Sequence, residues 1–244
     1  MARIFITGST DGLGLLAARA LVGNGHRVVL HARNQDRGKE ALDKVPGAET
    51  VFTGDLSNLE ETKRLAHEVN HSGRFDAVIH NAGVYQASAA QILAVNTLAP
   101  YVLTCLLPKP QRLIYLSSGM HLHGQPNLDQ IRKNTAQLSY SDSKLHVVML
   151  SMAVARKWPT VLSNAVDPGW VPTKMGGKGA PDNLQKGYET QVWLAVSADE
   201  KANVSGRYFY HQKERSCHPI AADVVLQEKF LARCRDLTGV SLAE

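Results

Sequence analysis

The amino-acid sequence predicts an α/β protein built on a doubly wound parallel sheet, with helices on both faces of that sheet. Three observations predict this fold class. Short β-rich runs alternate with helical segments, the inner runs are apolar at nearly every position, and a glycine-rich turn joins the first strand to the first helix. Strands that are apolar on both sides are typical of a parallel sheet covered by helices on both faces.

The alternation begins at the start of the chain. Residues Ile4–Thr7 predict the first strand, and the segment after the glycine-rich turn has apolar residues at helical spacing. Gly23 and Gly25 predict the end of that helix. Residues 26–34 predict the second strand.

The following elements continue the pattern. A helical segment ends before Pro46, and residues 49–56 predict the third strand. Ser57 and Glu60 have the spacing of a capping box, so we expect a helix to begin at that point. Residues 75–83 predict a further strand with an almost continuous apolar run.

The second half of the chain adds the remaining elements. Residues 112–118 predict another buried strand, and a long helix follows over residues 139–158, closed by Pro159. Residues 161–169 and 206–211 predict the last two strands.

The chain shows no internal repeat, low-complexity tract or linker, so we expect a single domain over residues 1–244. Its one Gly- and Pro-rich stretch covers residues 167–183. A loop of this length inside a compact domain is more often functional than accidental. We therefore expect a substrate loop at about residues 170–184, and a candidate lid.

Composition and charge exclude several classes of function. The hydrophobic fraction of 44% and the charged fraction of 20% are those of an ordinary globular protein. The net charge is +5, but the basic residues are scattered, whereas nucleic-acid binding calls for a clustered basic stripe. No apolar stretch approaches the ~20 residues of a membrane span, so we expect neither a nucleic-acid partner nor a membrane span.

The three cysteines, Cys105, Cys217 and Cys234, are widely spaced and odd in number. They show no metal-ligand spacing, so we predict no metal site and expect free thiols in a reducing, cytoplasmic setting. The N-terminal residues show no signal-peptide pattern.

The glycine-rich turn, Thr7–Gly14, has the spacing Gly-x-x-x-Gly-x-Gly. Glycines between a strand and a helix allow a sharp turn and let a pyrophosphate approach the helix N-terminus, where free N–H groups favour anions. A tight turn with no ligand is the alternative, but the position directly after the first strand favours dinucleotide binding. The Lys-Ser/Thr pair of a P-loop is missing, which argues against a different nucleotide.

Several motifs resemble those of the short-chain dehydrogenase/reductase family. They are, in the family's order, the glycine-rich turn, Gly54–Leu56, Asn81–Gly83, Asn96, Ser117 with Ser118, Tyr140 with Lys144, and Pro168–Thr173. They extend to about Thr173, and the tail is more loosely similar to the retinol-dehydrogenase-like branch. The resemblance implies a Rossmann-type fold and an oxidoreductase that transfers a hydride between a nicotinamide cofactor and a small-molecule carbonyl or alcohol.

The resemblance also implies site residues. The catalytic candidates are Asn96, Ser118, Tyr140 and Lys144. The cofactor-binding candidates are Gly8, Ser9, Thr10, Asp11, Gly12, Leu13, Gly14, Arg33, Asp55, Leu56, Asn81, Ala82, Gly83, Tyr140, Lys144, Pro168, Gly169, Val171 and Thr173.

The end of the second strand bears on the choice of cofactor. A free ribose 2′-hydroxyl is usually held by an acidic residue at this point, and here the residues are Ala32 and Arg33. An arginine can bind a 2′-phosphate through charge-assisted hydrogen bonds, so we expect NADP(H). A solvated arginine is the alternative for Arg33. His31 and Arg37 could assist but receive no assignment.

Tyr140 and Lys144 lie four residues apart, and this spacing alone arises by chance at roughly 1 position in 500. On a helix the two side chains share one face. A nearby ammonium favours phenolate, so we expect the pKa of the Tyr140 phenol to be lowered towards working pH, where it would act as general acid or base. The family resemblance adds a contact between Lys144 and the nicotinamide ribose.

The other catalytic candidates each have a structural alternative. Ser118 is preferred to Ser117 because the family's catalytic serine matches the second of the pair, but either could bond a turn. Asn96 matches the family's asparagine that supports the lysine, and from the residues alone a buried, structural asparagine is the better interpretation. Thr173 matches the family's contact to the nicotinamide carboxamide.

The sequence departs from the family pattern around Asn96. Only the 12 residues Val84–Val95 separate it from the preceding motif, so we expect a truncated helix there. Pro100 and Pro108 bound the next helix. In many family members this flank makes the dimer contact, so the sequence leaves open whether the protein forms a homo-oligomer.

Two further alternatives stay open as well. A catalytically idle dinucleotide-binding sensor or scaffold of the same fold is the competing function. His121 and His123 either face substrate or are ordinary loop histidines.

Overall fold

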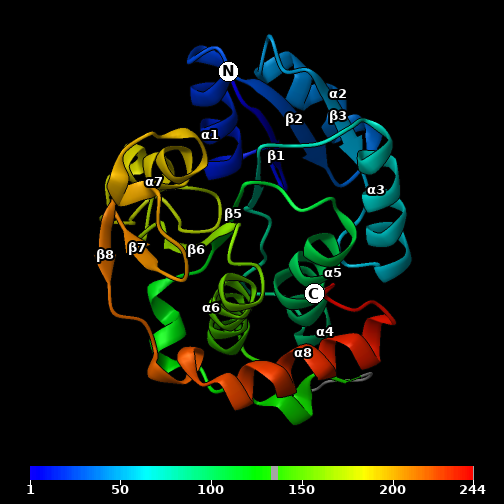
Figure 1. Ribbon diagram of the computed structural model, residues 1–244. Helices are drawn as coiled ribbons and strands as arrows, with labels where there is room; N and C mark the ends of the chain where they lie inside the picture. Colours follow the sequence, from blue (N-terminus) through cyan, green and yellow to red (C-terminus); the bar gives the residue numbers. More distant parts are fainter. Residues whose placement is uncertain (133–136, 244) are drawn as a thin grey trace.

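The computed structural model describes residues 1–132 and 137–243. These residues form an eight-stranded sheet in the order β3-β2-β1-β4-β5-β6-β7-β8 (Figure 1). The strands are β1 (Arg3–Ile6), β2 (Arg27–Ala32), β3 (Thr50–Thr53), β4 (Ala77–His80), β5 (Arg112–Leu116), β6 (Leu162–Asp167), β7 (Tyr208–Tyr210) and β8 (Lys213–Arg215). Neighbouring strands from β3 to β7 are parallel, and β8 pairs with β7 in the antiparallel sense.

Helices cover both faces of the sheet, as the sequence predicts. The α-helices are α1 (Gly12–Gly23), α2 (Gln35–Lys44), α3 (Leu59–His71), α4 (Ala89–Ile92), α5 (Ala99–Leu106), α6 (Tyr140–Lys157), α7 (Leu184–Val196) and α8 (Val224–Thr238). Buried apolar residues form one cluster with α1, α2 and α7 on one face and another with α3, α5 and α6 on the other. Helix α8 packs against α6 at the C-terminal end of the chain (Figure 1).

Short helical segments complete the fold. They are a π-helix, η1 (Leu93–Leu98), and the 3-10 helices η2 (Gly119–His123), η3 (Leu128–Gln130), η4 (Glu200–Ala202) and η5 (Pro219–Ala222).

Some elements differ from the sequence prediction. Residues 206–211 are not the last strand, because the chain turns back through His211 and Gln212 into β8. All three residues of β8 are exposed and charged, so no apolar pattern announces the strand. Helices α7 and α8 were also not predicted.

The start of α3 also differs. Asn58, not Ser57, caps the helix, since its Oδ1 accepts hydrogen bonds from the amides of Glu60 and Glu61 at 3.0 and 3.2 Å. The Ser57 hydroxyl instead donates to Asp55 Oδ1 at 2.7 Å. The capping-box spacing therefore predicted the start of the helix to within two residues but predicted the wrong N-cap residue.

The region around Asn96 is shortened, as expected. Helix α4 has only four residues and runs without a break through the π-helix into α5, and Asn96 lies inside the π-helix. Within the described residues, the run Ala89–Leu106 is long and apolar enough to span a membrane by length and composition, which the sequence analysis did not anticipate. This is weak evidence, because 61% of the run is buried inside the protein, as in the core helix of a globular fold.

The strand order reverses between β1 and β4, which are neighbours at the centre of the sheet. In doubly wound sheets, ligands bind at the carboxyl ends of the strands beside such a reversal. The glycine-rich turn leaves β1 and the Asn81–Gly83 segment leaves β4 at this edge. The fold therefore brings these two predicted motifs together.

Candidate active site

The glycine-rich turn packs directly against the segment after β4. Gly8 has φ +63°, and a Cβ added there would lie 2.9 Å from the Ala82 Cα. A Cβ on Gly14 would lie 2.4 Å from Asn81 Nδ2 and 2.5 Å from the Gly8 carbonyl oxygen. Side chains at these two positions would push the turn away from β4.

Asn81 joins the two segments by hydrogen bonds. Its Nδ2 donates to the carbonyl oxygens of Thr7 and Gly8 at 2.9 and 3.0 Å. Ser9 is fully buried, and its hydroxyl bonds the backbone of Ile6. Asn81 and Ser9 therefore hold the shape of the turn.

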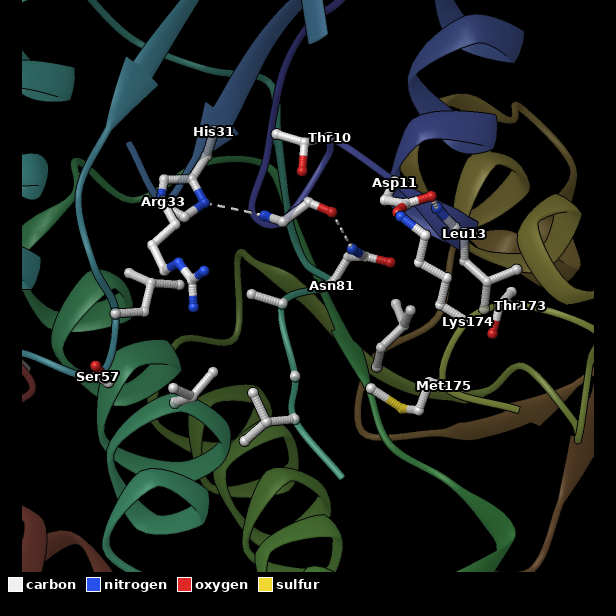
Figure 2. Close-up of a pocket in the computed structure, with 18 of the residues that line it drawn as sticks. Thr10, Asp11, Leu13, His31, Arg33, Ser57, Asn81, Thr173, Lys174 and Met175 are labelled. Carbon is white, nitrogen blue, oxygen red and sulfur yellow. Dashed lines mark hydrogen bonds and ion pairs between the residues drawn. The ribbon is translucent and has the colours of Figure 1, made fainter. Parts of the chain in front are cut away.

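His31, on β2, supports the same turn, and Figure 2 shows its ring joined to the turn by a hydrogen bond. Its Nδ1 accepts from the Gly8 amide at 3.0 Å, so its Nε2 carries the proton and donates to the Gly54 carbonyl at 3.0 Å. Burial lowers the pKa of His31 to about 4, which keeps the ring neutral. His31 received no assignment from the sequence, because the two backbone groups that it joins belong to other segments of the chain.

A cavity of about 390 Å³ opens above this turn. The predicted cofactor residues that line it are Gly8, Thr10, Asp11, Gly12, Leu13, Arg33, Asp55, Leu56, Asn81, Ala82, Gly83, Tyr140, Lys144, Pro168 and Thr173. Ser9, Gly14 and Val171 lie behind its wall, and Gly169 lines a neighbouring cavity.

The two sides of this cavity carry basic side chains. Arg33 and Ser57 lie on one side, and Lys174 lies on the other beside Asp11 (Figure 2). Arg33 is exposed. The ammonium of Lys174 pairs with the Asp11 carboxylate, and this hydrogen bond is the main cause that lowers the pKa of Asp11. Lys174 was not singled out from the sequence, where it is one polar residue of a long loop.

Arg37 reaches the glycine-rich turn as well. Its Nη2 donates to Thr10 Oγ1 at 3.0 Å and lies 3.7 Å from Asp11 Oδ2. Asp55 Oδ1 accepts hydrogen bonds from the amide and the hydroxyl of Ser57 at 2.9 and 2.7 Å.

These residues fit a nicotinamide dinucleotide. The glycine-rich turn brings the start of α1 to the cavity, where the N-terminal amides of a helix favour the charge of a pyrophosphate. The Gly12 amide donates to the capping Asp11 carboxylate at 2.8 Å, so Leu13 would hold that group, and Arg33 would hold the adenosine ribose end. A bound nicotinamide would donate or accept a hydride.

Tyr140 is the first residue of α6, and Ser118 follows β5. Their side chains share a hydrogen bond, which acts to lower the pKa of the phenol. The ring of Tyr85 packs edge-on against Tyr140, with ring centroids 4.8 Å apart. Ser118 Oγ also caps η2 by accepting from the Met120 amide.

Lys144 lies one turn further along α6 and is buried. Its Nζ donates to the Leu116 carbonyl at 2.8 Å and lies 5.4 Å from the centroid of the Tyr140 ring. Burial lowers the pKa of Lys144 to about 8. The predicted pair is therefore on one helix face and inside the site.

The predicted lowering of the Tyr140 pKa was wrong. Burial, the dominant cause, raises the pKa of the phenol to about 12, and the charge of Asp167 acts in the same direction. Desolvation disfavours the phenolate more strongly than the neighbouring groups favour it. The phenol therefore keeps its proton at neutral pH.

The structure separates the functions of the two serines. The Ser117 hydroxyl is buried and donates to the Lys144 carbonyl at 2.8 Å, so it joins β5 to α6. The side chain of Ser118 faces Tyr140.

Asn96 is buried and clamps Val84. Its Oδ1 accepts from the Val84 amide at 2.8 Å, and its Nδ2 donates to the Val84 carbonyl at 2.9 Å. A Cβ on Gly83 would lie 3.3 Å from Lys144 Nζ and 3.5 Å from Asn96 Oδ1. Asn96 thus makes the structural contacts expected from the residues alone and also borders the lysine.

His121 is fully buried in η2, whereas His123 is exposed. The Nε2 of His121 accepts from the His218 amide at 3.1 Å, so its Nδ1–H donates to the Ser118 carbonyl at 2.8 Å. His121 therefore supports the backbone of Ser118.

A second cavity of about 910 Å³ adjoins the first at Tyr140, which lines both. Its walls include Ser118 and residues of the loop that begins after β6, among them Trp170 and Met175. Residues of the predicted substrate loop thus line the same cavity as Ser118 and Tyr140. In the described part of the chain, no group of three His, Cys, Asp or Glu residues could hold a metal ion.

Comparison with known proteins agrees with this geometry. Residues 2–107 match the short chain dehydrogenase family model. The chain is 46% identical to an uncharacterized oxidoreductase of Emericella nidulans over 99% of both chains.

The chain belongs to the short-chain dehydrogenase/reductase family.

The family's retinol dehydrogenases are more distant relatives. Human retinol dehydrogenase 14 is 28% identical over 93% of this chain and 83% of its own length. Among solved structures, an uncharacterized protein from Mycobacterium Paratuberculosis superposes with a TM-score of 0.85 at 23% identity, covering 100% of this chain and 96% of its own. The predicted family and its Rossmann-type fold are confirmed.

Proposed function

We propose that the protein is an NADP(H)-dependent short-chain oxidoreductase that interconverts a small-molecule carbonyl and its alcohol, with Tyr140 as general acid and base. The observation that carries the proposal is that Tyr140 lines both the dinucleotide-sized cavity and the second cavity. Ser118 lies beside it and Lys144 beneath it. No observation favours the idle alternative.

In the reductive direction, Ser118 and Tyr140 hydrogen-bond the substrate oxygen. The carbonyl carbon gains a hydride, and the oxygen gains the phenolic proton of Tyr140, so the products are an alcohol and a phenolate. The ammonium of Lys144 stabilises that phenolate. Because the phenol keeps its proton in the free site, the residues are poised to donate it.

The preference for NADP(H) rests on charge. Arg33 lines the cavity directly after β2, and Ala32 stands where an acid would repel a 2′-phosphate. A guanidinium can bind phosphate through paired hydrogen bonds. Arg37 donates to Thr10 on the glycine-rich turn, but its charge is shared with Asp11 and Glu40, so the preference rests on Arg33.

A cytoplasmic location remains part of the proposal. Cys105, Cys217 and Cys234 are all free thiols, and burial raises the pKa of each. Unpaired cysteines suit a reducing compartment.

The test is a scan of NADPH consumption against ketones, aldehydes, quinones and steroids, repeated with Tyr140→Phe. The variant keeps the ring and its packing against Tyr85 but removes the proton donor. We expect kcat to fall by at least about 100-fold while the NADPH Kd stays within about twofold. Unchanged turnover would remove Tyr140 from the mechanism.

A further inference from the structure

The second cavity combines aromatic rings with carboxylates. Its aromatic lining residues are Tyr85, Tyr140, Trp170 and Tyr210, and Trp170 is 60% exposed. An exposed indole beside an active-site tyrosine offers a flat apolar contact to a ligand. The aromatic lining therefore suits a substrate with an aromatic body.

Asp167 places a negative charge at the reacting end of this cavity. It ends β6, its Oδ1 accepts from the Gly169 amide at 2.9 Å, and its Oδ2 lies 3.0 Å from the position of a Cβ on Gly119. Gly119 directly follows Ser118. The Asp167 charge also raises the pKa values of Tyr140 and Lys144, which shows that it acts on the catalytic groups.

Asp182 supplies a second carboxylate from the substrate loop. Its Oδ2 accepts from the Trp170 amide at 2.6 Å, and its Oδ1 accepts from the Tyr210 hydroxyl at 3.5 Å. These contacts hold the carboxylate between two of the aromatic residues that line the cavity.

The balance of charge in the cavity is negative. Lys174 is the only basic residue among the described lining residues, and its ammonium pairs with Asp11 on the glycine-rich turn. Asp167 shares its charge with the Lys144 ammonium behind the cavity wall, whereas no basic residue among the described lining residues pairs with Asp182. The negative charge is therefore confined to this cavity and does not reflect the charge of the whole protein, which is +5.

We propose that the substrate is an aromatic carbonyl compound that carries a protonated amine, which Asp167 and Asp182 recognise while Ser118 and Tyr140 bind the carbonyl oxygen. A cation is attracted both to carboxylates, through charge-assisted hydrogen bonds, and to the faces of aromatic rings. A neutral ketone of the same shape gains neither contribution. This inference rests on the proposed function, because it names the substrate class of the same site.

The test compares two ketones of the same shape. The first is para-(dimethylaminomethyl)acetophenone, which is cationic at neutral pH, and the second is its neutral isostere para-isobutylacetophenone. We expect kcat/KM to be at least about tenfold higher for the cation, as one charged hydrogen bond predicts. In Asp167→Asn and Asp182→Asn the ratio of the two values should fall towards one, and in Asp236→Asn, a surface control on α8, it should stay unchanged. Equal kcat/KM for both ketones in the wild type would overturn the inference.

Binding measured without turnover separates this inference from the proposed function. Tryptophan fluorescence of the wild type and of Trp170→Phe, whose difference reports Trp170, is titrated with benzyltrimethylammonium, which has no carbonyl, and with neutral neopentylbenzene. Selective quenching by the cation supports the inference even if neither ketone is reduced, a result that would count against the proposed function alone. Turnover of both ketones without selective quenching or a cation preference would leave the oxidoreductase in place and reject the cationic substrate.

Discussion

The close contact between Gly14 and Asn81 makes Gly14→Ala a sharp test of how the cofactor cradle is built. A Cβ at this position would lie 2.4 Å from Asn81 Nδ2 and 2.5 Å from the Gly8 carbonyl oxygen. The Asn81 side chain would have to leave, and with it both hydrogen bonds to the turn. At about 1 kcal/mol each, the lost bonds cost about 2 kcal/mol.

The remaining contributions partly cancel. The Gly8 backbone cannot rotate away as a side chain can, so overpacking adds about 1–3 kcal/mol. Alanine in a helix recovers about 1 kcal/mol relative to glycine. The free energy of unfolding should therefore fall by about 2–4 kcal/mol, and the displaced turn should weaken NADPH binding by about tenfold or more.

The assay is urea unfolding followed by circular dichroism, together with NADPH fluorescence titration. Gly23→Ala is the matched control, because Gly23 lies in the same helix and a Cβ there meets nothing within 4 Å. The control should be neutral or stabilising by up to about 1 kcal/mol, with normal NADPH affinity. If Gly14→Ala behaves like this control, the reasoning about the turn is refuted.

Three further predictions concern charge. Arg33→Ala should weaken the binding of NADPH by about 1.5–3 kcal/mol and the binding of NADH only slightly, because only NADPH has a 2′-phosphate. Equal losses of binding free energy for the two cofactors in parallel titrations would contradict the NADP(H) preference. Because the pKa of Lys144 is about 8, its ammonium is present below that pH and lost above it, so kcat/KM for reduction should decline above about pH 8; a profile flat to about pH 10 would argue against this role. Burial lowers the pKa values of His31, His80 and His146 to about 4, 3 and 4, so below about pH 6.5 the unfolded chain binds more protons than the folded one and stability declines. Each of these three histidines should lower the free energy of unfolding by roughly 2 kcal/mol between pH 7 and pH 5. Equal midpoints of urea unfolding at pH 7 and pH 5 would refute this.

Much of the fold follows from local patterns in the sequence. Alternating apolar runs and helical segments indicated the parallel sheet, and a turn of glycines after β1 indicated the dinucleotide end of the site. Tyr140 and Lys144 share a helix face because of helical periodicity, which needs only a spacing of four residues. Such features are determined over a few residues, so a single sequence displays them.

The tertiary structure alone decided what surrounds these groups. His31 bonds Gly8 and Gly54, each 23 residues away, and Asn81 bonds Gly8 across 73 residues. The pKa of Tyr140 is raised because packing removes water from the phenol, an effect that depends on distant elements. Long-range contacts and desolvation arise only when the chain is assembled, and the helical spacing of Tyr140 and Lys144 carries no information about either.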